Sequence, residues 1–214
     1  MIAFASWTGT KTTLSALQGA GWRLLMSPDT LERCANKTRP YWPDGSAAPF
    51  ALDNGAWGCF QRREPFDEKR FAWALARIGA DAEWIVMPDS VGDPQKTMQM
   101  AGRWWRQLAD YSNPLLAVQD GMIEDDVRPW IARGFGIFLG GSTEWKLDTM
   151  KRWGKLARET GAYFHVGRVN TARRIKLCSL CGADSFDGTS VTRFSKNISR
   201  LTNANRQLAL LEVI

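Results

Sequence analysis

Short apolar runs recur along the whole chain, and most are followed by a polar turn and then by a stretch with helical periodicity. The runs that we interpret as strands are 2–7, 22–26, 49–52, 84–87, 115–118, 136–139, 163–166 and 185–186. The stretches that we interpret as helices are 11–20, 28–37, 67–78, 94–111, 123–133, 145–159, 171–181 and 192–212. Regular alternation of the two predicts a parallel sheet with right-handed crossovers.

Eight such repeats favour closure of the sheet into a compact (β/α)8 TIM-like barrel. An open doubly wound sheet is the alternative, because periodicity does not show closure. The 214 residues, 44% of them hydrophobic, fit one domain with a sizeable core, so we assign 1–214 to a single barrel domain. Residues 37–50 contain three prolines and a glycine, and we expect a long loop there before the third strand.

Composition indicates the expected location of the protein and the charge of its partner. The first residues are apolar but have no basic leader and soon turn polar, so we expect neither a signal peptide nor a membrane span. Four cysteines do not indicate a secreted disulfide framework, which favours a cytoplasmic location. The net charge of +6 favours a polyanionic partner.

The aromatic content adds one more hypothesis. Among eleven tryptophans, Trp57, Trp104, Trp105 and Trp145 lie beside polar or glycine-rich stretches, where an indole ring can stack on a base. Packing in the core or between helices is the alternative for each of them.

Polar or glycine residues follow six of the predicted strands. They are Asp53, Asp89, Gln119 with Asp120, Gly140 with Gly141, Gly167 with Arg168, and Asp187. In a barrel of this kind the working groups lie on the loops after the strands, so these residues are expected to converge on one site.

The residue types suit glycosidic-bond chemistry on a flat polar heterocycle. Small flexible residues follow Asp187 and leave open space for a nucleophile, although an Asp that caps the next helix is the alternative. One carboxylate can attack an anomeric carbon while a second, Asp53, handles the proton of the base. Asp89 and Gln119 can read a base edge, and the Gly140-Gly141 pair lets backbone N–H groups approach a carbonyl. Three Asp residues could instead bind a divalent cation, but the acidic spacing of a cation loop is missing.

The order of these motifs resembles the tRNA-guanine transglycosylase superfamily. The resemblance rests on Leu52-Asp53-Asn54-Gly55, Pro88-Asp89-Ser90, Val118-Gln119-Asp120-Gly121, Leu139-Gly140-Gly141-Ser142, His165-Val166-Gly167-Arg168-Val169 and Ser185-Phe186-Asp187 with Thr192-Arg193. It implies a (β/α)8 barrel that exchanges a guanine in nucleic acid for a 7-deazaguanine through a covalent glycosyl-enzyme intermediate. By position it implies Asp187 as nucleophile and Asp53 as proton-transfer base. Asp89, Gln119, Gly140 and Gly141 would then recognise the base, and His165 and Gly167 would line the pocket.

The zinc motif of the family's tRNA enzymes is missing here. The chain is therefore more similar to the phage and bacterial branch that modifies DNA. This resemblance implies DNA and a base such as preQ0 as partners, with tRNA as the alternative substrate, and the host cytoplasm as the location of a phage-encoded protein. We expect no cofactor. An improvised zinc site of Cys178, Cys181 and His165 is the alternative, although cysteines at helical spacing are more typical of a packed helix face.

Basic residues cluster around the proposed nucleophile. Arg168, Arg173, Arg174 and Lys176 follow the seventh strand, and Arg193 and Lys196 begin the last helix. We expect them to contact phosphates, with a solvated helix face as the alternative. The sequence thus predicts a base-exchange glycosyltransferase. A glycosidase that releases the base and a non-catalytic nucleic-acid-binding module are the alternatives, and a partner subunit or a homodimer is left open.

Overall fold

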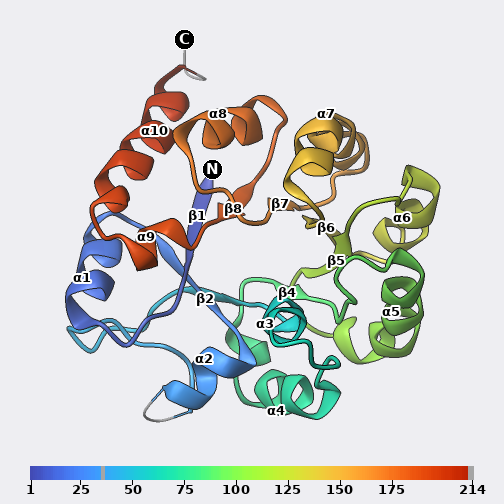
Figure 1. The fold of residues 1–214 in the computed structure, drawn as a ribbon, viewed down its shortest axis with the longest axis horizontal. Helices are drawn as coiled ribbons and strands as arrows, with labels where there is room; N and C mark the ends of the chain where they lie inside the picture. The colour runs from blue at the N-terminus through green and yellow to red at the C-terminus, as the bar shows by residue number, and fades with distance from the viewer. Residues whose placement is uncertain (35–36, 212–214) are drawn as a thin grey trace.

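The strands of the sheet follow one another around a closed ring. The computed structural model describes residues 1–34 and 37–211, within which eight parallel strands form a barrel in chain order (Figure 1). The strands are β1 Ile2–Ser6, β2 Arg23–Met26, β3 Phe50–Leu52, β4 Ile85–Val86, β5 Pro114–Val118, β6 Gly136–Leu139, β7 Phe164–Val166 and β8 Ser185–Asp187. β8 pairs with β1, with Phe4 in register with Asp187. The predicted (β/α)8 barrel is confirmed, and the open sheet is excluded.

Helices surround the strands (Figure 1), and several of them follow a polar capping residue. They are α1 Lys11–Gly19, α2 Pro28–Arg33, α3 Ala56–Gln61, α4 Glu68–Ile78, the 3-10 helix η1 Gly79–Asp81, α5 Pro94–Leu108, α6 Glu124–Ile131, α7 Thr143–Thr160, α8 Ala172–Leu180, α9 Ser190–Arg193 and α10 Asn197–Leu211. The side chains of Ser27, Asp67, Asp93, Ser142 and Thr171 each accept a backbone N–H in the first turn of a helix. Such caps satisfy N–H groups that have no partner within the helix.

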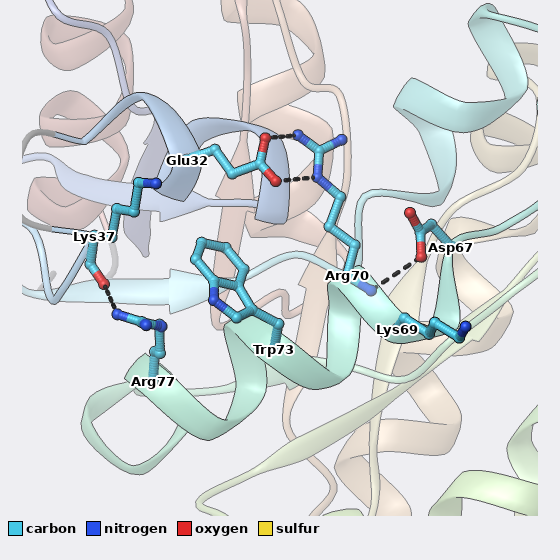
Figure 2. Close-up of a pocket in the computed structure, with 7 residues that line it drawn as sticks. All are labelled: Glu32, Lys37, Asp67, Lys69, Arg70, Trp73 and Arg77. Atoms are coloured by element: carbon cyan, nitrogen blue, oxygen red, sulfur yellow. Dashed lines mark hydrogen bonds and ion pairs between the residues drawn. The ribbon is translucent and has the colours of Figure 1, made fainter.

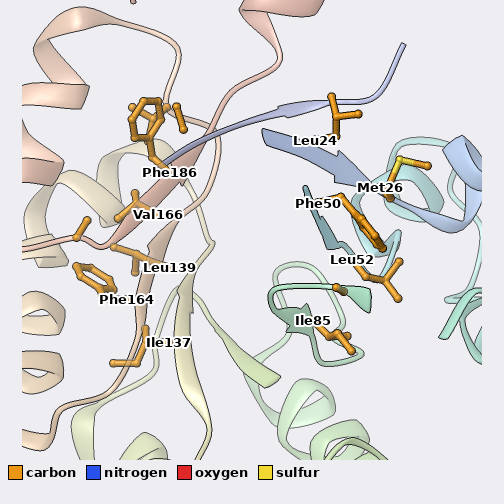
Figure 3. Packing of buried hydrophobic residues seen from close by; sticks show 14 of the residues in the cluster. Leu24, Met26, Phe50, Leu52, Ile85, Ile137, Leu139, Phe164, Val166 and Phe186 are labelled. Atoms are coloured by element: carbon orange, nitrogen blue, oxygen red, sulfur yellow. The ribbon is translucent and has the colours of Figure 1, made fainter. Parts of the chain in front are cut away.

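Alternate side chains of each strand point to opposite faces, which creates two apolar layers. The larger layer lies between strands and helices, and Figure 3 shows part of it, with Leu24, Phe50, Ile137 and Phe186 among its members. The smaller layer fills the barrel interior with Phe4, Leu25, Ala51, Trp84, Val86, Leu115 and Ala117. Burial on both faces explains why the strands read as apolar runs rather than as an alternating pattern.

Two predicted helices differ in the structure, and one helix was not predicted. The helix expected at 192–212 is divided, because Phe194 is extended (φ −136°, ψ 91°) between α9 and α10; Glu212 lies outside the described residues. The helix expected at 28–37 ends at Arg33, since Cys34 is extended (ψ 127°); residues 35–36 also lie outside the described part. α3 was not expected, because its six residues are too few to show a helical period.

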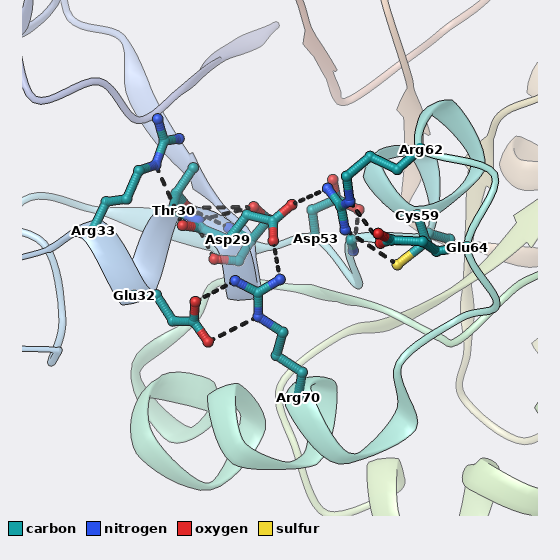
Figure 4. Close-up of polar contacts among 12 residues, drawn as sticks. Asp29, Thr30, Glu32, Arg33, Asp53, Cys59, Arg62, Glu64 and Arg70 are labelled. Atoms are coloured by element: carbon teal, nitrogen blue, oxygen red, sulfur yellow. Dashed lines mark hydrogen bonds and ion pairs between the residues drawn. The ribbon is translucent and has the colours of Figure 1, made fainter.

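Ion pairs fix α3 beside its neighbours (Figure 4). The carboxylate of Asp29 on α2 contacts Arg62, which follows α3, at 3.1 Å and also pairs with Arg70 on α4. Arg70 pairs in addition with Glu32. The network holds α3 over the end of β3, where Asp53 follows the strand.

Among the helices of the described residues, none combines the length and the apolar character that a membrane span requires.

Candidate active site

A cavity of about 360 Å³ opens at the carboxyl ends of the strands. Its lining includes the predicted residues Asp53, Asp89, Gln119, Gly140, Gly141, Gly167, Arg168, Asp187 and Arg193, and Trp57, which was a candidate for stacking on a base. It also includes Ser6, Asn54 and Asn170, which were not predicted as site residues. The structure therefore brings most of the predicted site together. This end of the barrel is where the βα loops of such folds build their active sites.

Asp187 is the last residue of β8 and is held by two N–H groups. Its Oδ2 lies 3.1 Å from His165 Nε2, and its Oδ1 accepts the backbone N–H of Arg168 at 3.2 Å. The side chain is nearly buried at the floor of the cavity. The orientation of its carboxylate oxygens is thus set by His165 on β7 and by Arg168, two residues beyond that strand.

Asp53 and Asp89 are carboxyl groups that change protonation near neutral pH. Burial, followed by the negative charge of Asp187, raises the pKa of Asp53 to about 7. Burial also raises the pKa of Asp89 to about 6, although a hydrogen bond from Asn54 opposes the shift. A group with a pKa close to the working pH can both take and give a proton, which suits acid–base catalysis.

Asn54 is a buried residue at the site whose role sequence reasoning missed. Its Nδ2 donates to Met87 O at 2.6 Å and to Asp89 Oδ1 at 2.7 Å, while its Oδ1 accepts the N–H of Ala56 at 2.7 Å. It therefore ties the end of β4 to the start of α3. The bond from Ala56 N–H to the Asn54 side chain forms an Asx turn, a local signal that was hidden because α3 itself was not predicted.

Arg168 connects three parts of the cavity rim. Its backbone is left-handed (φ 59°), which is unusual for a residue other than glycine. Its guanidinium donates to Gly141 O and lies over the Trp57 ring, with Cζ 4.3 Å from the ring centroid. Since its N–H also holds Asp187, Arg168 links the β6, β7 and α3 segments.

The second residue of the predicted glycine pair has a clear steric reason. Gly141 has φ +74°, and a Cβ there would lie 2.4 Å from Asp120 Oδ2. The Asp120 carboxylate accepts the N–H of Ser142 at 2.6 Å, which fixes the turn after β6. Gly140 carries no comparable restriction, since its nearest neighbour would be 3.5 Å away.

The Gln119 carboxamide is engaged within the protein. Its Nε2 donates to Ser90 O at 2.9 Å and to Thr97 Oγ1 at 2.6 Å, and its Oε1 accepts the N–H of Gly92 at 2.7 Å. These bonds order the loop between β4 and α5. A direct contact from Gln119 to a ligand stays a prediction.

His165 lies beneath the cavity rather than in its lining. It is fully buried inside the barrel, with ring centroids 4.4 Å from Trp84 and 5.0 Å from Phe138. Burial lowers the pKa of His165, although Asp187 opposes the shift. Its contact with the site runs through Asp187.

The predicted phosphate-binding cations lie in three different places. Arg168 and Arg193 line the cavity, whereas Arg174 borders a neighbouring hollow of about 10 Å³ beside Lys146. Arg173, Lys176 and Lys196 are exposed on the surface nearby. Contact of any of them with the phosphates of a nucleic acid stays a prediction.

Lys146 is a second residue that sequence reasoning missed. It is buried on α7, its Nζ donates to Gly167 O, and burial lowers its pKa to about 8. A lysine inside an amphipathic helix carries no sequence signal of such burial.

The four singled-out tryptophans occupy different environments. Trp57 lies in the cavity lining and is 38% exposed. Trp104 is buried with its ring centroid 5.2 Å from that of Phe71, and Trp145 packs 6.1 Å from Trp153. Trp105 is partly buried beneath Arg106, whose Cζ lies 5.1 Å from its ring centroid. Core or helix packing therefore accounts for all of them except Trp57.

A second hollow lies between α2 and α4 (Figure 2). Its polar groups satisfy one another: Arg70 pairs with Glu32, Asp67 accepts the N–H of Arg70, and Arg77 donates to Lys37 O. Both carboxylates in its lining, Glu32 and Asp67, are engaged in these contacts. The barrel mouth is therefore the stronger candidate for catalysis.

A metal site does not emerge from the described part of the chain, where no three His, Cys, Asp or Glu residues form a group that could hold a metal ion. Cys178 and Cys181 are buried near the end of α8, and burial raises the pKa of Cys178 to about 12. His165 is engaged by Ser185 and Asp187. The expectation of no cofactor is left untested.

The fold and the position of the cavity place this chain in the class of (β/α)8 barrel proteins. Comparison with solved structures agrees, since 184 chains match this fold. No protein-family model matches the chain, and a search of curated proteins finds no similar sequence.

The structural neighbours include enzymes of two kinds. A 4-hydroxy-2-oxoglutarate aldolase/2-deydro-3-deoxyphosphogluconate aldolase from TTHB1 is 13% identical, with a TM-score of 0.59 over 97% of this chain and 93% of that chain. A mutant tryptophan synthase alpha-subunit from Pyrococcus furiosus is 12% identical, with a TM-score of 0.56 over 97% and 96%. A structure described as native KDPGal is 10% identical, with a TM-score of 0.57 over 98% and 97%.

These neighbours contradict the resemblance to the tRNA-guanine transglycosylases and, with it, the predicted exchange of guanine for a 7-deazaguanine in DNA. They belong to other barrel families. The physical reason for the error is that any (β/α)8 enzyme places polar and glycine residues after its strands, because its loops carry the site. The order of such residues therefore reports the fold, and the fold does not imply the function.

Proposed function

We propose that the protein is an enzyme that catalyses aldol-type proton-transfer chemistry on a small anionic hydroxy-carbonyl compound. The observation that carries the proposal is a pair of carboxyl groups with pKa values of about 7 and 6 that face one cavity with Asp187. Arg168 and Arg193 in the same lining suit a carboxylate or phosphate on the substrate. The aldolase among the structural neighbours supports the reaction class.

The proposed reaction uses Asp53 as base and Asp187 as acid. Ionised Asp53 takes the proton of the substrate hydroxyl while the adjacent carbon–carbon bond breaks. The electrons of that bond move to the carbonyl-bearing fragment, which becomes an enolate. Asp187, which is ionised at the start, receives a proton from solvent through the protein and passes it to the enolate carbon. Asp53 then releases its proton to water at the mouth, so both carboxylates are ionised again and protons balance over the cycle.

The cavity lining favours this route over an imine mechanism. No lysine belongs to the lining of the main cavity among residues 1–34 and 37–211. Lys146 Nζ is committed to Gly167 O beside a hollow of about 10 Å³, which is too small for a substrate. We therefore expect no covalent adduct when borohydride is added with a 2-oxo acid. An adduct on Lys146, found by mass spectrometry, would favour the imine route.

The test is a panel of 4-hydroxy-2-oxo acids and phosphorylated hydroxy-ketones, with release of the oxo fragment followed by a coupled dehydrogenase. Asp53→Asn should lower kcat/KM by at least about 100-fold, the low end for loss of a general base. Asp148→Asn is the matched control, because Asp148 is exposed on α7. Wild-type kcat/KM should rise as the pH passes through about 7, where Asp53 ionises. Full activity of Asp53→Asn, or no turnover of any compound in the panel, would overturn the proposal.

A further inference from the structure

A chain of hydrogen bonds runs through the barrel interior from the floor of the cavity. His165 Nε2 lies 3.1 Å from Asp187 Oδ2, and His165 Nδ1 lies 2.7 Å from Ser185 Oγ. Tyr163 Oη lies 2.8 Å from the same Ser185 oxygen. The adjacent strands place these groups together, because His165 on β7 is in register with Ser185 on β8.

The surroundings of this chain are apolar. Phe4, Trp84 and Phe138 lie around the His165 ring at centroid distances of 6.0, 4.4 and 5.0 Å. Ser185 and His165 are both 0% exposed. Polar groups in such an interior are costly unless every one has a partner, and here each has one. Apolar side chains could fill the same space, so a connected polar column points to a use beyond packing.

The donors in this chain of hydrogen bonds all point in one direction. Burial favours the neutral form of His165, which has one ring N–H. Since an ionised Asp187 can only accept, the N–H is at Nε2, and Nδ1 accepts the Ser185 hydroxyl. The Ser185 oxygen in turn accepts the Tyr163 hydroxyl. The hydrogens of Tyr163, Ser185 and His165 thus point toward Asp187.

The end of the hydrogen-bond chain at Tyr163 lies at the opposite end of the barrel from the cavity. Tyr163 directly precedes β7, and Ser185 is the first residue of β8. Tyr163 is partly exposed, so its hydroxyl group can exchange protons with solvent there. Burial is the largest of the effects that raise the pKa of Tyr163, so its hydroxyl group carries its proton at neutral pH.

We propose that Tyr163, Ser185 and His165 form a proton relay that supplies Asp187 from the amino-terminal end of the barrel. In one transfer, His165 Nε2 gives its proton to Asp187, Ser185 gives its proton to Nδ1, Tyr163 gives its proton to Ser185, and water at the barrel end reprotonates Tyr163. Every atom that loses a proton regains one, and the net change is one proton on Asp187. Rotation of the hydroxyls and a change of imidazole tautomer then restore the starting state. The purpose of the relay rests on the proposed function, but its existence is measured without a substrate.

The test uses the imidazole of His165, the single histidine in the sequence. In Asp187→Asn the cavity end of the chain can no longer pass protons, so exchange of the imidazole N–H with solvent must run through Ser185 and Tyr163. Adding Tyr163→Phe should then slow that exchange, measured by 15N NMR, by at least about tenfold. Adding Ser185→Ala should have the same effect. Tyr41→Phe, at a residue that is 46% exposed, is the matched control and should change nothing.

The outcomes separate the relay from its proposed use. Equal exchange rates in Asp187→Asn with and without Tyr163→Phe would overturn the relay, and this result does not depend on the substrate. If the panel above reveals a substrate, Tyr163→Phe should lower kcat and increase its solvent isotope effect while KM is unchanged. A purely structural role would leave the isotope effect as it is in the wild type.

Discussion

The carboxyl group of Asp53 destabilises the folded protein at neutral pH, and the same raised pKa suits the group to proton transfer. It is partly buried and faces the charges of Asp187 and Asp89, so its ionised form is disfavoured in the folded protein. In the unfolded chain the same group ionises at its ordinary pKa of 3.8. The folded state therefore binds the proton more tightly, and stability falls as the pH rises from about 4 to about 7.

Asp53→Asn should remove this penalty. The free energy of unfolding of the variant, relative to wild type, should increase between about pH 4 and pH 7 and stay level above. A gain of about 2 kcal/mol is expected, since one pKa unit corresponds to about 1.4 kcal/mol and partial exposure reduces the full shift. Urea unfolding at several pH values measures it. A pH-independent difference would contradict the assignment of the shift to Asp53.

Arg168 is a second residue whose backbone is strained for the sake of its contacts. A left-handed conformation costs a residue with a Cβ about 1 kcal/mol, and glycine avoids this cost. Arg63 adopts the same conformation (φ 58°) on the exposed turn after α3. The two positions differ in what the side chain contacts, because the Arg168 guanidinium lies over Trp57 and donates to Gly141 O.

Replacing each arginine by glycine should therefore give different results. Arg63→Gly should stabilise the protein by about 1 kcal/mol, because it only relieves strain. Arg168→Gly should change stability by less than about 1 kcal/mol, because lost contacts offset the relief, yet it should lower kcat/KM at least about tenfold. Thermal unfolding and the aldol assay measure the two effects. Equal stabilisation by both substitutions would show that the Arg168 side chain contributes nothing.

At the scale of elements, one close contact sets the distance between α7 and the turn after α8. Gly154 lies in α7, and a Cβ there would come within 1.8 Å of Cys181 O. Cys181 ends α8 just before β8 begins, so this contact also places the strand that carries Asp187. Gly102 in α5 has nothing within 4 Å of the corresponding position.

Alanine at these two helical glycines should act in opposite directions. Gly154→Ala should destabilise the protein by at least about 3 kcal/mol, the upper range for overpacking, since a backbone carbonyl must move. Gly102→Ala should stabilise it by about 1 kcal/mol through helix propensity. Midpoints of chemical unfolding compare the two. A mild effect at Gly154 would mean that the α8 turn shifts freely.

At the scale of the whole molecule, contacts between the two ends of the chain support the closed ring. β8 pairs with β1, and α10 lies over the same region (Figure 1). Trp22 Nε1 donates to Thr202 Oγ1 at 2.7 Å, and Asn205 Nδ2 donates to Met1 O at 2.9 Å. The bond between Trp22 and Thr202 is buried and joins residues 180 positions apart.

Thr202→Val keeps the shape of the side chain but leaves the Trp22 N–H without its partner. We expect a loss of about 2 kcal/mol, the cost of a buried unsatisfied donor. Thr12→Val is the control, because Thr12 is exposed on α1. Differential scanning calorimetry should show one transition at a lower Tm for Thr202→Val. An unchanged Tm would mean that water replaces the lost acceptor.

Much of the fold could be predicted from local pattern. The apolar runs and the helical periods marked each strand of the barrel, because strands buried on both faces are continuously apolar. The boundaries failed where local sequence is ambiguous: α3 is too short to show a period, and Phe194 interrupts the last helix without a proline or glycine. Asp53, Asp89 and Asp187 were found because the carboxyl ends of parallel strands meet at one end of a barrel.

The sequence by itself determined the alternation of strand and helix and the polar residues that end the strands, since both are local properties of the chain. Tertiary structure decided the rest. Closure of the ring, the pKa values of Asp53 and Asp89, and the column of Tyr163, Ser185 and His165 depend on segments far apart in sequence. Desolvation and hydrogen bonding across neighbouring strands exist only after packing, so no local pattern encodes them.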